Sequence, residues 1–214
     1  VVKDAVVPTM NAKNPHAALL LQRGVTGREC EKIWIKKEIV QWDQLLKTGD
    51  SSPIRVYTRS DACGAAETWA RYMHGSQEDL QGVGVFGDPG LAEAVRNDTL
   101  GIGYNNINFA YDAKTKKPVA GLIILPLDLN ANGRIDTKES FYETRDCIMK
   151  AIADSIYPSP PARDLHLVSK GKPAKKAVVT FLRWIMNEGR KYVPEAGYID
   201  FSVDKLRKEK RKLQ

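Results

Sequence analysis

The residues best suited to chemistry lie in the stretch 54–73. Ile54, Val56 and Thr58 alternate with charged or polar neighbours, which is the period of a β-strand. A turn of small residues follows, and then an alanine-rich segment with helical spacing. The first amide groups of a helix have no intrahelical partner and lie at the positive end of its dipole. The stretch therefore predicts a site for an oxyanion such as phosphate.

Two charged side chains beside this loop sharpen the prediction. Arg59 can donate two parallel hydrogen bonds to an oxyanion. Asp61 repels an anion, but an ionised carboxylate accepts hydrogen bonds. It therefore favours a ligand that keeps a proton at neutral pH, as phosphate does and sulfate does not. The structural alternative is that Asp61 caps the helix and Arg59 faces solvent.

Cys63 allows an interpretation from another class, an enzyme whose thiolate attacks phosphate. A position at a helix N-terminus would lower the pKa of its thiol. The phosphatase pattern, however, needs an arginine six residues after the cysteine, where this chain has Trp69, and Arg71 is eight residues away. The spacing argues against this chemistry, and we expect no enzyme.

A second motif, residues 128–139, matches the twelve-residue calcium loop at its ligand positions, with Gly133 at the turn and Ile135 at the apolar position. The predicted Ca²⁺ ligands are Asp128, Asn130, Asn132, the carbonyl of Arg134, Asp136 and Glu139. Residues 119–127 resemble a strand and residues 140–152 a helix, so we predict a lone structural calcium site and not a paired sensor. The alternative is a polar turn rich in Asp and Asn.

The residues of the anion loop also carry a resemblance. Arg59-Ser60-Asp61-Ala62-Cys63-Gly64-Ala65 resembles the Arg-Ser-Asp-Gly-Ser-Gly-Thr loop of periplasmic phosphate-binding proteins, the substrate-binding components of phosphate ABC importers. Other stretches are similar to the same family in the same order, over nearly the whole chain. They are residues 6–11, 101–104, 157–158, 163–168, 181–185, 188–189 and 195–199.

The resemblance implies a protein that binds inorganic phosphate or a similar oxyanion outside the cytoplasm and delivers it to an ABC permease. It implies a periplasmic or extracytoplasmic location, with membrane contact through the permease or through a lipid anchor outside this sequence. The implied phosphate-binding residues are Arg59, Ser60, Asp61, Cys63, Gly64 and Ala65. Cys63 replaces the family's Ser and Ala65 its Thr, so two hydroxyl donors are lost. These losses keep open an alternative, a calcium-stabilised structural or sensor domain of the same fold without ligand binding.

Composition sets the outer bounds. The chain has 214 residues, 43% of them hydrophobic, a net charge of +7 and a pI near 9.2. This charge favours anionic partners, but much of it lies in the runs 170–176 and 205–212, which do not interleave with aromatic residues. We therefore expect no nucleic-acid partner. The three cysteines lack metal-ligand spacing and do not fix the redox compartment.

The hydrophobic pattern predicts a mixed α/β fold. The Thr26 and Glu29 pair predicts a capping box for a helix over residues 27–36, and Pro8 favours an edge or crossing position for the first strand. Asp88 is expected to cap a helix over residues 89–96 after a glycine-rich loop. The other predicted elements are strands at residues 1–10, 100–104, 119–127, 165–169 and 197–203, a helix over 175–190 and a charged tail over 204–214.

The resemblance also implies an architecture, the type II periplasmic-binding-protein plan of two α/β lobes joined by crossing strands. On that plan residues 1–11 are the first crossing strand, residues 12–158 the second lobe, and residues 159–214 the return crossing and the last part of the first lobe. The family carries further chain before the first crossing, so the first lobe should be incomplete here. We expect residues 1–11 beside residues 163–169, and an under-buried apolar face on the helix 175–190.

Overall fold

The computed structural model describes residues 1–212, and the predicted α/β class is confirmed. The strands are β1 (Val2–Asn11), β2 (Arg55–Arg59), β3 (Val83–Val85), β4 (Gly101–Asn106), β5 (Leu122–Ile124) and β6 (Ala162–Leu165). The α-helices are α1 (Ala17–Arg23), α2 (Gly27–Trp34), α3 (Trp42–Leu46), α4 (Gly64–Tyr72), α5 (Gly87–Asn97), α6 (Ile107–Ala110), α7 (Arg145–Ala153), α8 (Lys176–Ile185) and α9 (Val203–Arg211). Two 3₁₀ turns, η1 (Gln77–Asp79) and η2 (Glu188–Tyr192), complete the described elements.

The strands form one mixed sheet in the order β3-β2-β4-β1-β5, with β6 paired to the other half of β1. Strand β2 pairs parallel with β3 and β4, whereas β1 pairs antiparallel with β4, β5 and β6. The parallel strands place the loop after β2 at the same edge as the end of β4, as expected when strand carboxyl ends meet at one edge. This edge carries the candidate site described below.

Strand β1 pairs with three other strands, β4, β5 and β6, and eight of its ten residues are buried. Residues 2–5 pair with β6, and residues 9–11 pair with β5. Pro8 lies between these two registers, where β1 changes partner and no N–H donor is needed on that side. The sequence predicted an edge or crossing position for Pro8. The structure places it inside the sheet, opposite Tyr104 of β4, where β1 changes partner on its other side. A proline inside a sheet is tolerated where the ladder is interrupted.

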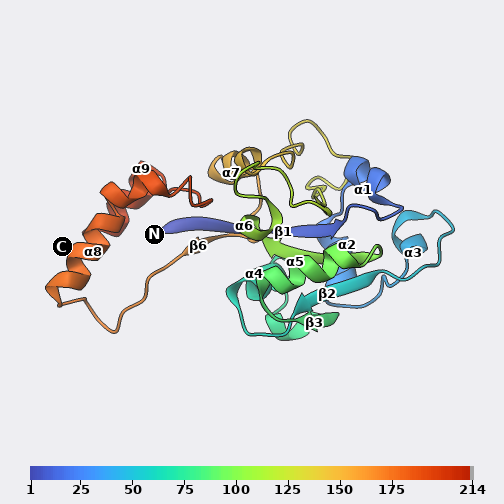
Figure 1. The fold of residues 1–214 in the computed structure, drawn as a ribbon, viewed down its shortest axis with the longest axis horizontal. Helices are drawn as coiled ribbons and strands as arrows, with labels where there is room; N and C mark the ends of the chain where they lie inside the picture. The colour runs from blue at the N-terminus through green and yellow to red at the C-terminus, as the bar shows by residue number, and fades with distance from the viewer. Residues whose placement is uncertain (213–214) are drawn as a thin grey trace.

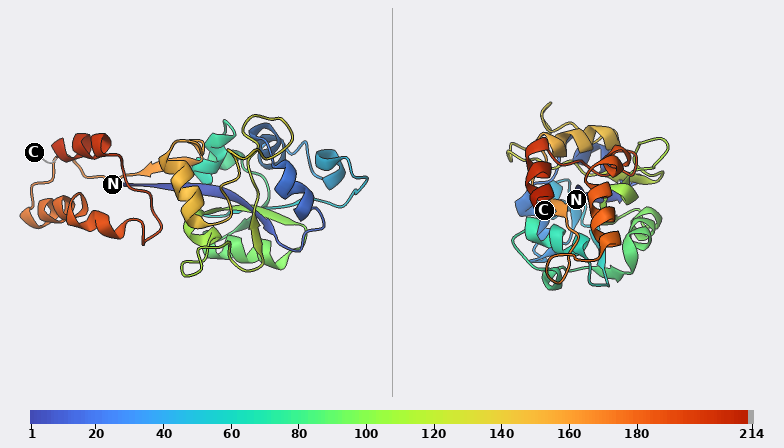
Figure 2. Two further views of the ribbon diagram at one scale, coloured as in Figure 1. Left: turned by 90° about the horizontal axis from the view of Figure 1, so that it is seen from above. Right: turned by 90° about the vertical axis from the view of Figure 1, so that its left-hand side faces the viewer.

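The molecule has a large α/β part and a smaller helical part joined by β1 and β6 (Figure 1). Helices α8 and α9 lie beyond the start of β1, away from the main sheet, in Figure 1 and in the left view of Figure 2. The expected neighbourhood of the first strand and the returning segment is confirmed for residues 163–165, since Val2 pairs with Leu165 and Asp4 with Arg163. The strand predicted over residues 165–169 lies earlier, at Ala162–Leu165. Ile199 adds a single bridge to Lys3 in place of the predicted last strand.

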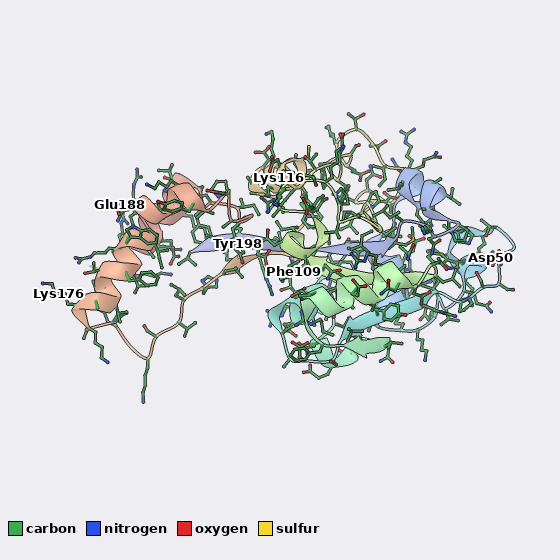
Figure 3. All side chains as sticks on the ribbon, viewed as in Figure 1. Asp50, Phe109, Lys116, Lys176, Glu188 and Tyr198 are labelled. Atoms are coloured by element: carbon green, nitrogen blue, oxygen red, sulfur yellow. The ribbon has the colours of Figure 1, made fainter. Side chains whose placement is uncertain are left out.

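Helix α8 has an apolar face that the described residues leave partly uncovered. None of its residues is buried, and Leu182, Ile185 and Met186 are only half-buried, as predicted. Phe181 and Trp184 are exposed and stack on each other with ring centroids 6.3 Å apart. Figure 3 shows α8, with its first residue Lys176 labelled, at the opposite end of the long axis from Asp50.

Two predicted elements differ from the structure around the glycine-rich segment. Residues 83–85 form the short strand β3, which was predicted as loop. Helix α5 begins at Gly87 and not at Pro89, with Phe86 as its N-cap. Asp88 therefore lies inside the first turn and does not cap it, which frees its carboxylate for partners from other elements.

Two further predictions overestimated the lengths of elements near the calcium-type loop. The apolar segment 119–127 contains only a three-residue strand, β5, because residues 120–121 form an exposed turn before it. Leu125 and Leu127 are buried after the strand, and Leu127 makes only a single bridge to Val25. The helix predicted over residues 140–152 begins at Arg145. Phe141 and Tyr142 are buried instead, with ring centroids 4.5 Å apart, so their side chains anchor the segment before the helix.

Aromatic packing fixes helix α4 against the sheet. The Trp69 ring makes an edge-on contact with Trp34 at 5.3 Å and stacks on Tyr104 of β4 at 5.8 Å. All three side chains are fully buried. Large aromatic contacts of this kind hold elements rigidly, so the N-terminus of α4 has a fixed position relative to the ends of β2 and β4.

Candidate functional site

The loop from β2 to α4 forms the centre of the candidate site. Cys63 has extended backbone angles and caps the helix, with its Sγ accepting a hydrogen bond from the Ala66 amide at 3.4 Å. The amides of Gly64 and Ala65 begin the helix, where intrahelical acceptors do not exist. Gly64 is exposed. Of the first three amides of the helix, those of Gly64 and Ala65 remain as donors for an anion, because the Ala66 amide already donates to Cys63 Sγ.

Arg59 ends β2 and is held between two carboxylates. Its Nε and Nη2 donate to the two oxygens of Asp61 at 2.9 and 2.6 Å, and its Nη1 donates to Asp88 Oδ2 at 2.8 Å. The Arg59 side chain is only 6% exposed. The hydrogen bonding that Arg59 donates to Asp61 is the main reason that the pKa of Arg59 is raised. The alternative of a solvent-facing Arg59 was wrong, and three of its five donors already have carboxylate partners.

Asp61 is an ionised acceptor in this arrangement. The hydrogen bond from Arg59, followed by the one from the Gly87 amide at 3.1 Å, lowers the pKa of Asp61 to about 2. Its alternative role as the cap of α4 was wrong, since Cys63 takes that position. Asp61 holds the guanidinium in one orientation, which fixes the direction of the remaining Arg59 donors.

The other predicted residues of the loop contribute unequally. The Ser60 amide donates to the Val85 carbonyl at 3.0 Å, and its side chain is exposed. The methyl group of Ala65 is buried, so only its backbone reaches the site. Cys63 uses its thiol as a cap and its amide to bind Gln77 Oε1 at 2.9 Å. Apart from the exposed hydroxyl of Ser60, the loop thus offers backbone donors.

Four residues that the sequence reasoning missed complete a continuous polar network. Asp88 accepts hydrogen bonds from the backbone and side-chain nitrogens of Asn106 at 3.4 and 3.3 Å. Asn106 Oδ1 accepts from Arg163 of β6 at 3.4 Å, and Arg163 also bonds Asp4 of β1 at 3.3 Å. The network therefore runs from the anion loop to β1 and β6. The available signal was the pair of charged residues within each of the two strands, Lys3 and Asp4 in β1 and Arg163 and Asp164 in β6.

Tyr104 of β4 contacts the end of β2 through its hydroxyl group. Its hydroxyl lies 2.9 Å from Thr58 Oγ1 and accepts the Arg59 amide at 3.2 Å. Burial raises the pKa of Tyr104 to about 12, so the phenol stays protonated at neutral pH. The residue fixes the end of β2, where Arg59 turns into the site.

Comparison with known proteins places the chain in a family. A family model described as a PBP superfamily domain matches residues 1–188. The chain belongs to the PBP superfamily. A search among curated proteins found no match. Among the described residues of this PBP-superfamily chain, no helix combines the length and apolar character needed to cross a bilayer.

Solved structures with the same fold include proteins described as phosphate-binding. "A possible phosphate binding protein" from Planctomyces limnophilus aligns over 100% of this chain and 70% of its own, at 19% identity and a TM-score of 0.68. An ABC-type phosphate transport receptor from Vibrio cholerae aligns over 92% and 70%, at 18% and 0.65. PstS from Borrelia burgdorferi aligns over 94% and 71%, at 19% and 0.58. At these identities the likeness shows the fold.

The calcium-type loop of this PBP-superfamily chain is closed by its own hydrogen bonds. Asp128 accepts the amides of Asn132 and Gly133 at 3.2 and 2.8 Å, and buried Glu139 accepts those of Leu129 and Asp136 at 2.8 and 3.1 Å. Within residues 1–212, no three His, Cys, Asp or Glu side chains gather closely enough to hold a metal ion. The loop has the oxygen ligands that Ca²⁺ prefers, but the carboxylate oxygens of Asp128 and Glu139 accept hydrogen bonds from backbone amides.

Proposed function

We propose that this PBP-superfamily chain binds inorganic phosphate, or a similar protonated oxyanion, at the N-terminus of α4. The observation that carries the proposal is the placement of the Gly64 and Ala65 amides at the start of α4, in the loop that Arg59 opens. Amides and a guanidinium supply donors to an anion. Arg59 together with its two carboxylate partners, Asp61 and Asp88, has a net negative charge. This charge favours a ligand that still carries a proton. The phosphate-binding proteins of the same fold support this choice.

Delivery to an ABC permease and an extracytoplasmic location belong to the same proposal. They are supported by the family and by the transport receptor of Vibrio cholerae, whose description names phosphate transport. The division into a crossing strand (residues 1–11), a second lobe (residues 12–158) and a returning segment (residues 159–214) is likewise proposed. It is supported by the pairing of β1 with β6.

Calorimetric titration tests the binding proposal directly. The chain is titrated with inorganic phosphate and with sulfate at pH 7, and Arg59→Gln is titrated in parallel. We expect binding of phosphate in preference to sulfate, and its loss in the variant. Absence of phosphate binding by the unmodified chain would overturn the proposal.

We further propose that Ca²⁺ binds the loop 128–139 and stabilises the fold, through Asp128, Asn130, Asn132, the Arg134 carbonyl, Asp136 and Glu139. Two features favour it beyond the residue types. Gly133 has φ +80° at the position where the calcium pattern requires glycine. The Ile135 amide donates to the Gln22 carbonyl at 2.7 Å, so the middle of the loop is anchored to the end of α1.

A further inference from the structure

Arg163 lies next to the anion loop although it comes from β6. It stands directly opposite Asp4 in the β1–β6 pair, and its guanidinium reaches over Gly64 at the start of α4. A Cβ atom on Gly64 would lie 2.5 Å from Arg163 Nη1, so a side chain at this position would have to displace the guanidinium. The glycine thus leaves room for a guanidinium at the same helix terminus that offers the amides.

The hydrogen-bond donors of Arg163 are underused. Nη1 donates to Thr68 Oγ1 at 3.0 Å. Nη2 makes only long contacts, 3.3 Å to Asp4 and 3.4 Å to Asn106, whereas charge-assisted bonds are typically about 2.7–2.9 Å. Nε is buried and has no hydrogen-bond partner among the described residues. A buried donor without an acceptor is costly, so this guanidinium has the capacity for a further acceptor.

The electrostatic setting of Arg163 calls for an anion. A cation at a helix N-terminus is disfavoured, because that end of the dipole is positive. Asp4 is a weak counter-charge to Arg163, because burial raises the pKa of Asp4 and so disfavours its ionised form. Its second oxygen, Oδ1, has no hydrogen-bond partner among residues 1–212. An oxyanion between the α4 amides and Arg163 would satisfy both positive groups.

We propose that Arg163 is a second arginine of the oxyanion site and donates to the bound anion from β6. This inference rests on the proposed function. Arg163 supplies donors where Cys63 and Ala65 offer no hydroxyl groups. Because Arg163 belongs to β6 and pairs with β1, the bound anion is tied to both crossing strands.

Titration of the full chain with inorganic phosphate tests this role. Arg163→Gln should weaken binding about tenfold or more, because a charged donor is lost. Arg163→Lys should lose a smaller factor, since it keeps the charge without the planar fork. Asp4→Asn should bind phosphate more tightly, because its carboxylate no longer competes for Arg163. Arg207→Gln, on exposed α9, is the matched control and should bind as the unmodified chain does.

The outcomes separate this inference from the proposed function. If phosphate binds, Arg59→Gln abolishes binding and Arg163→Gln binds normally, the function stands and the role of Arg163 is overturned. If Asp4→Asn weakens binding as much as Arg163→Gln, Arg163 acts only as a partner of Asp4, and the role is again overturned. If the unmodified chain binds no phosphate, both proposals fail. Should Arg163→Gln not fold, Arg163→Lys and Asp4→Asn decide the question by the same comparisons.

Discussion

Two loops of this protein have the residue types of ligand sites, and they are built in opposite ways. The calcium-type loop satisfies its carboxylates within residues 128–139, through amides a few positions away. The anion loop instead places Arg59 beside Asp88 of α5, and Gly64 beside Arg163 of β6. The carboxylates of the calcium-type loop are therefore satisfied locally, although the Ile135 amide ties that loop to Gln22 of α1. The charges of the anion loop are instead paired between distant elements.

The difference teaches how far a local motif can be trusted. Hydrogen bonds inside the calcium-type loop span ten residues or fewer, so the sequence carries nearly all of the information for that loop. The contact between Arg163 and Asp4 spans 159 residues. Charges at the anion loop thus change with any shift of β6 against β1, while the calcium-type loop should keep its geometry.

The largest expected effect comes from removing Arg59. Arg59→Gln leaves Asp61 and Asp88 without their counter-charge, and we expect the free energy of unfolding to fall by about 1–3 kcal/mol, the range for a lost hydrogen-bond partner. Arg134→Gln in the calcium-type loop should change it by less than about 0.5 kcal/mol, because that side chain is 75% exposed. Urea unfolding of both variants measures the contrast. Equal effects would contradict the dependence of the anion loop on a buried charge.

Addition and removal of Ca²⁺ test whether the calcium-type loop binds the ion. When free Ca²⁺ is a hundredfold above its dissociation constant, binding should stabilise the fold by about 2.7 kcal/mol. Thermal unfolding in excess Ca²⁺ and in excess chelator measures this shift, and Glu139→Gln should remove it. A melting temperature that is the same in both conditions would mean that the loop is only a polar turn.

The pH dependence of stability should distinguish two carboxylates of the anion network. The pKa of Asp61 is lowered to about 2, chiefly by Arg59, so its contribution is present above about pH 4 and lost as pH falls toward 2. The pKa of Asp4 is raised by burial, so the folded state is favoured as pH falls toward its protonation. The urea midpoints of both variants and of the unmodified chain are measured between pH 2 and 7. Asp61→Asn should lose less stability than the unmodified chain as the pH falls toward 2. Asp4→Asn should lose less stability than the unmodified chain as the pH rises toward 7. The same profile for both variants would refute these opposite signs.

The smallest effect concerns ligand choice. Asp61→Asn replaces an acceptor-only carboxylate by an amide that can also donate, so it should reduce the preference for phosphate over sulfate by about tenfold or less. Competitive titration with the two anions at pH 7 measures the ratio. Asp136→Asn, in the calcium-type loop, is the matched control and should leave the ratio unchanged. An unaltered preference in Asp61→Asn would assign selectivity to other groups, Asp88 first among them.

The sequence by itself determined the features that depend on near neighbours. The Thr26–Glu29 capping box, the strand–loop–helix order around Arg59 and the amphipathic face of α8 were all predictable, because each rests on residues within one or two helical turns. The α/β class followed from the same periodicities. The resemblance in the anion loop pointed to the superfamily that the matched residues 1–188 support.

Only the tertiary structure decided which charges meet at the anion loop. Asp88 was predicted as a helix cap, and Asp4 and Arg163 were not assigned to the site at all. Their roles arise because β1 is paired with β4 on one side and with β6 on the other, which brings residues 4, 106 and 163 together. Burial then changes the chemistry of those groups, since a carboxylate removed from water holds its proton more firmly and a guanidinium without acceptors can bind an anion.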